Sequence, residues 1–354
     1  MSVYLHGLST ALPPHCLSQS DVKKRAEILF SKKYPQFQRL SKTFVTAGID
    51  ERYSVVPFDW FEDEHGWTDR NEAYMNGAKS LFITASQRAL NKAGWRAEEV
   101  DCVVTVSSTG IATPSLEAQV FSDVGFRNDI MRVPVFGLGC AGGVSGLATA
   151  RDLAAGRPNA KVLLVVIEAC SISFRADRMQ KADIIAAVLF GDGAAAACIS
   201  SEAPTSGAVV SLGSGHQIIW PDTINIMGWD VDETGFGVVF DRSIPAFVTQ
   251  EFAGATERAL TAANLTHDKI DRYVCHPGGA KVVEAIEGSL KLEEKSLGVE
   301  RDVLRDYGNM SAPTVLFVMK SVLESGQSGQ MMSCALGPGF SASFLPFHVT
   351  ADAA

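Results

Sequence analysis

The sequence predicts an α/β fold built from two copies of one structural unit. Short apolar or β-branched runs alternate with longer segments of helical periodicity, the pattern expected of buried strands connected by helices. Two stretches of the chain, 89–101 and 259–271, align with each other without a gap. The 354 residues give room for two domains or for one duplicated unit, so length and pattern agree.

The elements are expected in alternating order along the chain. Helices are indicated where apolar residues recur every three to four positions, and strands where apolar or β-branched residues run together. In chain order the predicted elements are a helix over 72–93, strands over 103–107 and 133–136, a helix over 141–155, a strand over 162–167, a helix over 247–263 and a strand over 273–275.

The internal repeat extends beyond the two aligned stretches. Each stretch ends a helix, turns and enters an apolar strand, at an offset of 259 − 89 = 170 residues. At nearly the same offset, 309 − 140 = 169, Asn309 falls opposite Cys140. The small-residue strands that begin at Gly193 and Gly339 each follow a Gly-x-Gly turn. The predicted division is an N-terminal half over 1–205 and a C-terminal half over 206–354, joined near 203–230.

Charge and composition exclude two classes of protein. The chain carries 40 acidic against 31 basic residues, a formal net charge of -9, which is the wrong sign for a protein whose main partner is nucleic acid. No run approaches the ~18 apolar residues of a membrane span, and the first residues lack the basic and apolar regions of a signal peptide. We therefore expect a cytoplasmic protein with no membrane span.

The cysteines indicate one reactive thiol. Seven are scattered through apolar stretches without a Cys-x-x-Cys pair, so neither a disulfide framework nor a zinc or other metal site is expected. Cys140 follows a strand and a glycine turn at the start of the predicted helix over 141–155. A helix N-terminus favours a thiolate, so we predict a nucleophile with a lowered pKa. The surrounding glycines would let a substrate carbonyl approach backbone N–H groups that could form an oxyanion hole.

A dinucleotide-binding motif overlaps this turn and is a serious alternative. Gly137, Gly139 and Gly142 satisfy Gly-x-Gly-x-x-Gly between a strand and a helix, and Glu168 ends the next strand, as a ribose-binding acid would. Against it, the motif lies well inside its domain and a cysteine occupies the loop. The repeat also places Asn309, rather than a second such motif, at the symmetric turn. We therefore prefer a nucleophile to nicotinamide binding.

His276 and Asn309 are the predicted partners of Cys140. Of the seven histidines, His276 alone follows an apolar strand and precedes a Pro-Gly-Gly turn, at a strand end where the sites of α/β proteins collect. Asn309 lies at a turn before a helix, where it could also be an ordinary N-cap. The repeat places it opposite Cys140, so that both turns converge on one cleft. A thiolate, an imidazole and two hydrogen-bond donors for an oxyanion are suited to acyl transfer.

Five motifs now connect the chain with a known family. They are Gly139-Cys140-Ala-Gly-Gly, Leu189-Phe-Gly-Asp-Gly-Ala-Ala-Ala, His276-Pro-Gly-Gly, Tyr307-Gly-Asn-Met-Ser and Gly337-Pro-Gly-Phe. With them the chain resembles, over nearly its whole length, the type III polyketide synthases, the chalcone and stilbene synthase family of the thiolase superfamily. The resemblance implies a homodimer with a thiolase-type fold, in which duplicated α/β units form a five-layered αβαβα core.

The resemblance also implies a reaction. Cys140 would be acylated by a starter acyl-coenzyme A, with His276 holding the thiolate as an ion pair. His276 and Asn309 would then donate hydrogen bonds to the thioester carbonyl of malonyl-coenzyme A, where decarboxylation makes an enolate. The enolate would attack the acyl-Cys140 thioester in a Claisen condensation. Repetition and cyclisation would release a pyrone or a phenolic or resorcinol ring, and no cofactor is expected besides these coenzyme A substrates.

Substrate contacts are implied in the same way. Phe190 matches the family's gate phenylalanine, and the second gate aligns near Val238, where the smaller side chain suggests a wider passage. Arg39 and Lys42 match two of three cations that meet the coenzyme A phosphates, with Thr46 at the third position on the same helical face. The other predicted cavity residues are Ser108, Cys170, Ser173, Ser311, Gly337, Pro338, Gly339 and Phe340. With small side chains at 108, 170 and 173, the chain resembles bacterial enzymes that accept fatty acyl starters.

Two alternatives to this function remain at the level of sequence. A β-ketoacyl carrier-protein synthase III-like enzyme also uses Cys, His and Asn but condenses once; His276-Pro-Gly-Gly and Gly337-Pro-Gly-Phe favour the polyketide family. The second alternative is a catalytically silent acyl-binding or scaffold protein. The intact set of Cys140, His276 and Asn309 argues against it.

Overall fold

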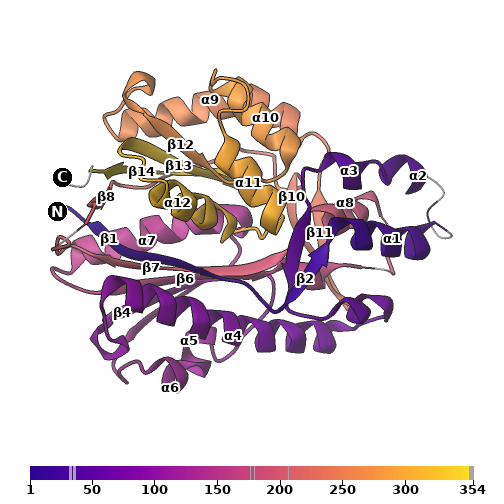
Figure 1. Ribbon diagram of the computed structural model, residues 1–354, viewed down its shortest axis with the longest axis horizontal. Coiled ribbons are helices and arrows are strands. Elements are labelled where there is room, and N and C mark those ends of the chain that lie inside the picture. The colour runs from indigo at the N-terminus through magenta and orange to yellow at the C-terminus, as the bar shows by residue number, and fades with distance from the viewer. Residues whose placement is uncertain (32–33, 35–36, 176, 179, 206, 351–354) are drawn as a thin grey trace.

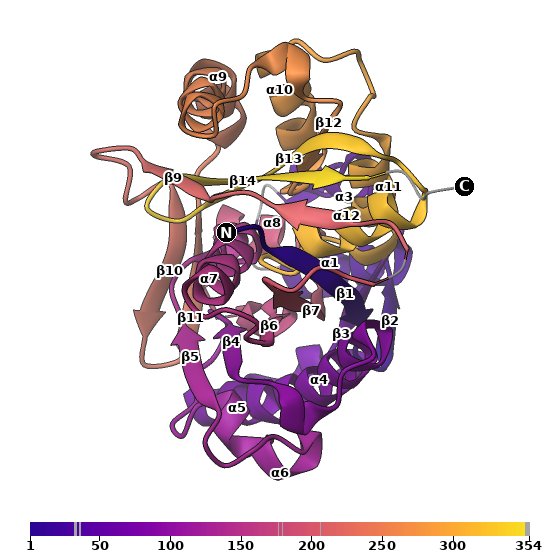
Figure 2. The ribbon, with the colours of Figure 1, turned by 90° about the vertical axis from the view of Figure 1, so that its left-hand side faces the viewer.

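The computed structural model describes residues 1–31, 34, 37–175, 177–178, 180–205 and 207–350, and it stacks their main elements in five layers. From bottom to top in Figure 1 these are helix α4, a sheet containing β1, β7, β6 and β4, helices α7 and α12, a sheet containing β14, β13 and β12, and helices α9 and α10. Figure 2 shows the same layers from one end. The expected αβαβα core is thus confirmed.

The bounds of the elements follow from the backbone. The strands are β1 (Tyr4–Ala11), β2 (His15–Ser18), β3 (Glu51–Ser54), β4 (Cys102–Val106), β5 (Met131–Val135), β6 (Val162–Ala169), β7 (Asp192–Ser200), β8 (Val210–Leu212), β9 (His216–Ile219), β10 (Met227–Asp232), β11 (Gly235–Phe240), β12 (Arg272–Cys275), β13 (Gly329–Gly337) and β14 (Ser341–Val349). The helices are α1 (Gln19–Phe30), α2 (Phe37–Leu40), α3 (Thr43–Thr46), α4 (Trp67–Ala93), α5 (Leu116–Gln119), α6 (Phe121–Val124), α7 (Gly142–Gly156), α8 (Lys181–Leu189), α9 (Ile244–Ala262), α10 (Ala280–Ser289), α11 (Gly298–Tyr307) and α12 (Thr314–Glu324). Short 3₁₀ turns are η1 (Phe58–Glu62), η2 (Ala97–Glu99), η3 (Gly139–Ala141), η4 (Cys170–Ser173) and η5 (His267–Lys269).

The two halves repeat one strand pattern. In the first half, β4 is parallel to β6, which is antiparallel to β7. In the second half, β12 is parallel to β13, which is antiparallel to β14. The aligned stretches also agree, since α4 and α9 each lead through a short 3₁₀ turn into β4 and β12. The predicted duplication is therefore visible in the connectivity.

Helices α7 and α12 lie between the sheets and carry the central core. Their apolar side chains, such as Leu147 and Leu316, pack with strand residues of both sheets, such as Leu164 and Leu345. Every residue of β6 and β7 is buried, because helices cover both faces of that sheet. Separate cores lie under α4 and under α9 and α10. The turns that precede α7 and α12 are thereby held between the two sheets.

The segment expected to join the halves contains strands of its own. β8 pairs with β1 on one side and with β14 on the other, and so merges the sheets of both halves into one ten-stranded sheet. β9 adds to β14, and β10 and β11 form a separate hairpin. The sequence analysis missed these strands, which are short or lie outside the duplicated pattern.

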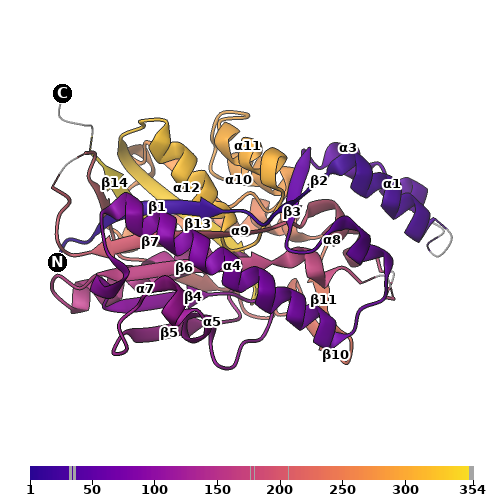
Figure 3. The ribbon, with the colours of Figure 1, turned by 60° about the horizontal axis from the view of Figure 1, so that its bottom comes forward.

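A smaller helical unit stands beside the layers. Figure 3 shows α1, α3 and α8 together at the end of the molecule that is remote from both labelled termini. Phe30, Phe44 and Ile184 contribute to one buried cluster that holds them together. The predicted single helical face over 39–46 is wrong, because the backbone forms two short helices, α2 and α3. Among the helices of the described residues, none has the length and apolar character that a membrane span requires.

Candidate active site

Cys140 lies in the turn that joins β5 to α7. Gly139 has a φ of 47°, and a Cβ there would lie 2.7 Å from Pro338 Cδ, so both backbone and space require glycine. The single 3₁₀ turn η3 carries the cysteine, and α7 starts two residues later. Gly337 packs as closely on this turn, since a Cβ there would lie 2.7 Å from the carbonyl oxygen of Leu138. The loop after β13 therefore fixes the turn from the second half of the chain.

His276 directly follows β12. Its backbone N–H donates to the carbonyl oxygen of Cys334 on β13 at 2.9 Å, which extends the strand pairing by one residue. The side chain is 4% exposed, and neither ring nitrogen has a hydrogen-bond partner among the described residues. A buried imidazole without partners is costly, so it is available to a group that enters the site.

Asn309 is held in a fixed orientation beside the turn that follows His276. Its side-chain Nδ2 donates to the carbonyl oxygen of Gly278 at 3.1 Å, and its Oδ1 accepts from the backbone N–H of Ser311 at 2.8 Å. An amide nitrogen carries two hydrogens, and the contact with Gly278 uses one of them. The Ser311 side chain in turn contacts Cys140. The structure thus connects the three predicted residues through Gly278 and Ser311.

Burial determines the protonation of the cysteine and the histidine. It raises the pKa of the Cys140 thiol to about 11, although the contact with Ser311 acts in the opposite direction. It lowers the pKa of the His276 imidazole to about 3. The predicted lowering of the thiol pKa is therefore wrong, because desolvation of the buried thiol outweighs the helix N-terminus. Both groups are neutral near pH 7.

A cavity of about 900 Å³, its open mouth included, lies in front of Cys140. Six of the predicted contacts line it: Ser108, Cys170, Phe190, Val238, Ser311 and Pro338. His276 and Asn309 lie outside these walls, and Asn309 is linked to the cavity through Ser311. Four further predicted contacts do not line this cavity: Ser173, Gly337, Gly339 and Phe340. Of these, Phe340 is fully buried and stacks on Trp220.

The hairpin of β10 and β11 supplies a wall that the sequence analysis missed. Trp229 and Phe236 stack with ring centroids 5.7 Å apart, and Trp229 Nε1 donates to the carbonyl oxygen of Ser108 at 2.8 Å. Val238 pairs opposite Trp229, and the Phe190 ring meets the indole edge-on at 6.5 Å. The signal available in the sequence for this hairpin was the pair of strand-length segments, 227–232 and 235–240, on either side of the turn at 233–234.

Glu168 is a buried wall residue and not a surface acid. Its Oε2 accepts from the backbone N–H of Ser108 and the hydroxyl of Thr109, at 2.9 and 2.8 Å, while Oε1 has no partner among the described residues. Burial raises the pKa of this carboxyl to about 8. A fully buried acid so engaged is unavailable to a ribose. In addition, a side chain at Gly142 would meet Val106 and Ala312, so this glycine serves helix packing. The dinucleotide alternative is therefore not supported.

The predicted coenzyme A contacts lie at the helical unit beside the layers. Lys42 precedes α3 and is exposed, and Thr46 is exposed at the end of the same helix. Arg39 belongs to α2, and its side chain lies outside the described residues. The exposed position of Lys42 leaves it accessible to an anionic group.

Comparison with known proteins identifies the class. Residues 2–203 match the family model for the N-terminal domain of chalcone and stilbene synthases, and residues 211–346 match the C-terminal domain. The chain therefore belongs to the chalcone and stilbene synthase family and is a type III polyketide synthase, a transferase that performs iterative decarboxylative Claisen condensations. The single-condensation carrier-protein synthase is not favoured.

Several relatives are similar over almost their full length. A 1,3,6,8-tetrahydroxynaphthalene synthase of Streptomyces peucetius is 35% identical over 345 residues, covering 95% of this chain and 90% of that protein. A putative chalcone synthase of Bacillus subtilis is 32% identical over 357 residues, covering 97% and 98%. The crystal structure of 1,3,6,8-tetrahydroxynaphthalene synthase from Streptomyces coelicolor superposes with a TM-score of 0.91 at 26% identity, covering 98% of this chain and 99% of that one.

Proposed function

We propose that Cys140 is the nucleophile that carries the starter and the growing chain. The thiol proton passes to the His276 imidazole, and the thiolate attacks the thioester carbonyl of an acyl-coenzyme A. When the tetrahedral intermediate collapses, the coenzyme A thiolate leaves and takes the proton back from the imidazolium. Both groups are neutral near pH 7, so the proton starts on sulfur. The transfer runs against the difference between the two pKa values, and attraction between the two opposite charges that it creates would offset that cost.

His276 and Asn309 then act on malonyl-coenzyme A. The thioester carbonyl accepts one hydrogen bond from the imidazole N–H and one from the Asn309 amide. Loss of carbon dioxide leaves an enolate whose negative oxygen those donors stabilise. The enolate carbon attacks the acyl-Cys140 carbonyl, the C–S bond breaks, and the thiolate is restored. The observation that carries this proposal is the buried imidazole, which has no hydrogen-bond partner in the described part of the chain, together with the amide held by Gly278 and Ser311.

The cavity walls would select substrate and product. Phe190 and Val238 stand at the proposed gate, and Ser108 and Cys170 leave room in the cavity wall. Relatives include proteins named for an aromatic polyketide, tetrahydroxynaphthalene. We propose cyclisation to a pyrone or to a phenolic or resorcinol ring, with acyl- and malonyl-coenzyme A as the substrates and without a cofactor. Arg39 and Lys42 would meet the phosphates of coenzyme A.

The assembly that we propose is a homodimer of a cytoplasmic protein. The strand β5 lies at the edge of the sheet, and Phe136, which follows it, is 58% exposed. An open edge strand beside an exposed aromatic ring favours association with a second copy. Within each protomer, the half over 1–205 would supply the nucleophile, and the half over 206–354 would supply His276 and Asn309.

A starter-loading experiment tests this function. The protein is incubated with single acyl-coenzyme A starters, and intact mass and peptide mapping locate the acyl group. We expect one acyl group on Cys140 in the wild type and in Cys16→Ala, which removes the exposed thiol, and none in Cys140→Ala. With malonyl-coenzyme A added, carbon dioxide and pyrones or resorcinols should form. Acylation of another residue, or product from Cys140→Ala, would overturn the proposal.

A further inference from the structure

The strand β12, which leads into His276, has a neighbouring strand on one side only. The order of the large sheet starts with β12 and β13, whereas the equivalent strand of the first half, β4, lies between β6 and β5. Among the described residues, no strand therefore covers the outer edge of β12. A buried backbone N–H on such an edge needs a partner from elsewhere, because an unpaired one is costly.

Glu300 supplies that partner. Its Oε1 accepts the backbone N–H of Cys275, the last residue of β12, at 3.1 Å. Its Oε2 accepts from Nη2 of Arg272, the first residue of the same strand, at 2.8 Å. The carboxylate is fully buried. One side chain from outside the sheet thus holds both ends of the four-residue strand that His276 directly follows.

The same side chain belongs to the helix that leads into Asn309. Glu300 lies in the first turn of α11, which ends two residues before Asn309. Between them, Gly308 has a φ of 67°, and a Cβ there would lie 2.9 Å from the carbonyl oxygen of Leu189, so this turn has no room to adjust. Glu300 therefore links the strand before His276 with the helix before Asn309.

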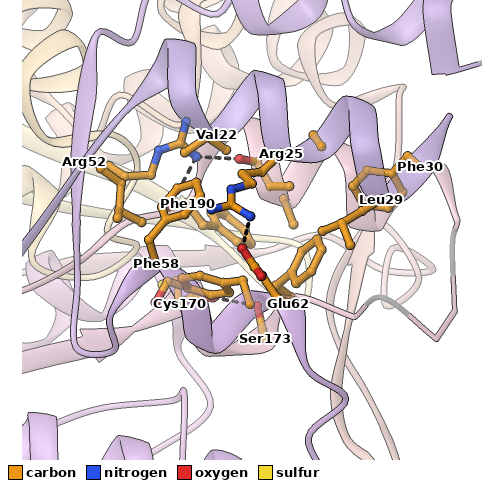
Figure 4. Close-up of a pocket in the computed structure, with 17 residues that line it drawn as sticks. Val22, Arg25, Leu29, Phe30, Arg52, Phe58, Glu62, Cys170, Ser173 and Phe190 are labelled. Carbon is orange, nitrogen blue, oxygen red and sulfur yellow. Dashed lines mark hydrogen bonds and ion pairs between the residues drawn. The ribbon is translucent and has the colours of Figure 1, made fainter.

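The C-terminal end of α11 is held by other contacts. The backbone N–H of Asn309 donates to the carbonyl oxygen of Leu189 at 2.8 Å, and its carbonyl oxygen accepts from the backbone N–H of Gly191 at 3.0 Å. Arg52 holds the residue between these two partners, since its Nη1 donates to the carbonyl oxygen of Phe190 at 3.4 Å (Figure 4). With this end anchored, the contact near the other end of α11 determines how β12 lies relative to it.

His276 and Asn309 meet at Gly278. The Asn309 amide donates to the carbonyl oxygen of Gly278 at 3.1 Å. A Cβ at Gly278 would lie 3.8 Å from His276 Nε2, so the imidazole lies against the same residue. Two donors that stabilise one oxyanion must each lie about 2.7–3.1 Å from it. A small shift of β12 relative to α11 would therefore take one of them out of hydrogen-bond range.

We propose that Glu300 is a positioning residue, which holds β12 and α11 so that His276 and Asn309 can both donate to one thioester oxygen. This inference rests on the proposed function, in which these two residues act on malonyl-coenzyme A. Replacing a buried ion pair by apolar residues is often neutral or stabilising, so stability alone does not account for the buried charges. An apolar side chain, however, could not accept the N–H of Cys275.

Glu287 on α10 offers a matched control. It is also buried, forms an ion pair with Arg301 at 2.6 Å and accepts the backbone N–H of Leu297 at 2.9 Å. Both partners lie on or next to α11, and neither belongs to β12. The variants Glu300→Ala and Glu287→Ala thus remove the same kinds of contact, but only the first one releases the strand before His276.

The release of carbon dioxide from malonyl-coenzyme A tests the proposal. We would measure kcat and KM, with folded protein counted by circular dichroism. In Glu300→Ala, kcat should fall by a factor of about 10 to 10², the cost of a catalytic group misplaced by about 1 Å. KM should change little, because the two donors act on charge that develops in the transition state. In Glu287→Ala, kcat per folded molecule should be unchanged.

The outcomes separate positioning from a purely structural role. A structural role would lower the melting temperature of both variants and leave kcat per folded molecule at the wild-type value. An unchanged kcat in Glu300→Ala, a rise in KM alone, or an equal fall in Glu287→Ala would overturn the proposal. If Glu300→Ala does not fold, Glu300→Gln, whose amide offers one acceptor oxygen instead of two, should show a smaller fall in kcat, and no fall there would be equally decisive. If His276→Gln releases carbon dioxide as fast as the wild type, the proposed function fails instead.

Discussion

Removal of the His276 imidazole should change how the reactivity of Cys140 depends on pH. A thiol with a pKa of about 11 is ionised in about one molecule in 10⁴ at pH 7. Between about pH 3 and pH 11 the thiol and the imidazole together hold one proton. Moving this proton from sulfur to nitrogen does not change the number of protons bound. The fraction of the pair present as thiolate with imidazolium is therefore independent of pH across that window. With pKa values of about 11 and about 3, attraction between the two charges must favour this ion pair by more than about 10⁴-fold for it to exceed, at pH 7, the thiolate formed by releasing the proton to solvent. The prediction is that the buried site supplies this attraction.

The variant His276→Gln should lose this independence. Without the imidazole, formation of the thiolate releases a proton to solvent, so its amount should rise tenfold per pH unit. At pH 7 the rate of alkylation of Cys140 should fall by a factor of about 10² to 10⁴, the usual contribution of a general base. His348→Gln, which changes an exposed histidine on β14, is the matched control.

Alkylation by iodoacetamide measures both effects. Peptide mapping separates Cys140 from the exposed Cys16, whose pKa is raised by burial and by the neighbouring Glu51, and which serves as an internal standard. We expect the rate at Cys16 to rise tenfold per pH unit from pH 6 to 8 in every variant, and the rate at Cys140 to stay nearly constant in the wild type and in His348→Gln. A wild-type Cys140 that follows the slope of Cys16 would refute the coupled pair.

Three further predictions address the same site and its support. Burial lowers the pKa of His276 from 6.5 to about 3, so below pH 6.5 the unfolded chain binds a proton that the folded chain does not, and stability falls. Between pH 7.5 and pH 5 the free energy of unfolding in urea should fall by about 2 kcal/mol less in His276→Gln than in the wild type. Equal losses would show that this histidine is solvated. Gly143→Ala places a Cβ against the carbonyl oxygen of Ala312, so we expect α7 and α12 to separate at a cost of about 1–3 kcal/mol, with lost activity. Gly254→Ala on α9, where a Cβ would meet no other described segment within 4 Å, should be neutral or stabilising in thermal melts, and a similar loss in both variants would contradict this packing argument. Cys140→Ala should release carbon dioxide from malonyl-coenzyme A without chain extension, and extension at the wild-type rate would exclude Cys140 as the nucleophile.

The repeat made much of the fold accessible from sequence alone. Helices α4, α7 and α9 lie within about five residues of the predicted ranges, because long amphipathic periods are local signals. The hairpin of β10 and β11 was missed because its turn at 233–234 lacks an Asn-Gly or Asp-Gly signal. Trp229 is half-buried and Phe236 is buried, and both line a cavity whose other walls lie far away in the sequence, which is a tertiary property.

The electrostatics of the site show the same limit. Sequence placed Cys140 correctly before a helix but predicted the wrong direction for its pKa. Burial raises this pKa, and the loop at Pro338, which is far away in the sequence, packs on the turn that carries Cys140. The position of Phe340 was likewise inaccessible, because its stacking on Trp220 joins two elements that no local pattern relates.

The strand β8 has a consequence for the order of the chain. Ser211 of β8 pairs with Tyr4 of β1 on one side, and Val210 of β8 pairs with Val349 of β14 on the other. The first and the last strand along the chain, β1 and β14, therefore lie two strand spacings apart, about 10 Å. A short peptide across β8 could join the two ends of the chain. If new termini were then placed between β7 and β8, the second half would be synthesised first. The architecture thus does not dictate which half comes first, and a circular permutant could assemble the same cleft.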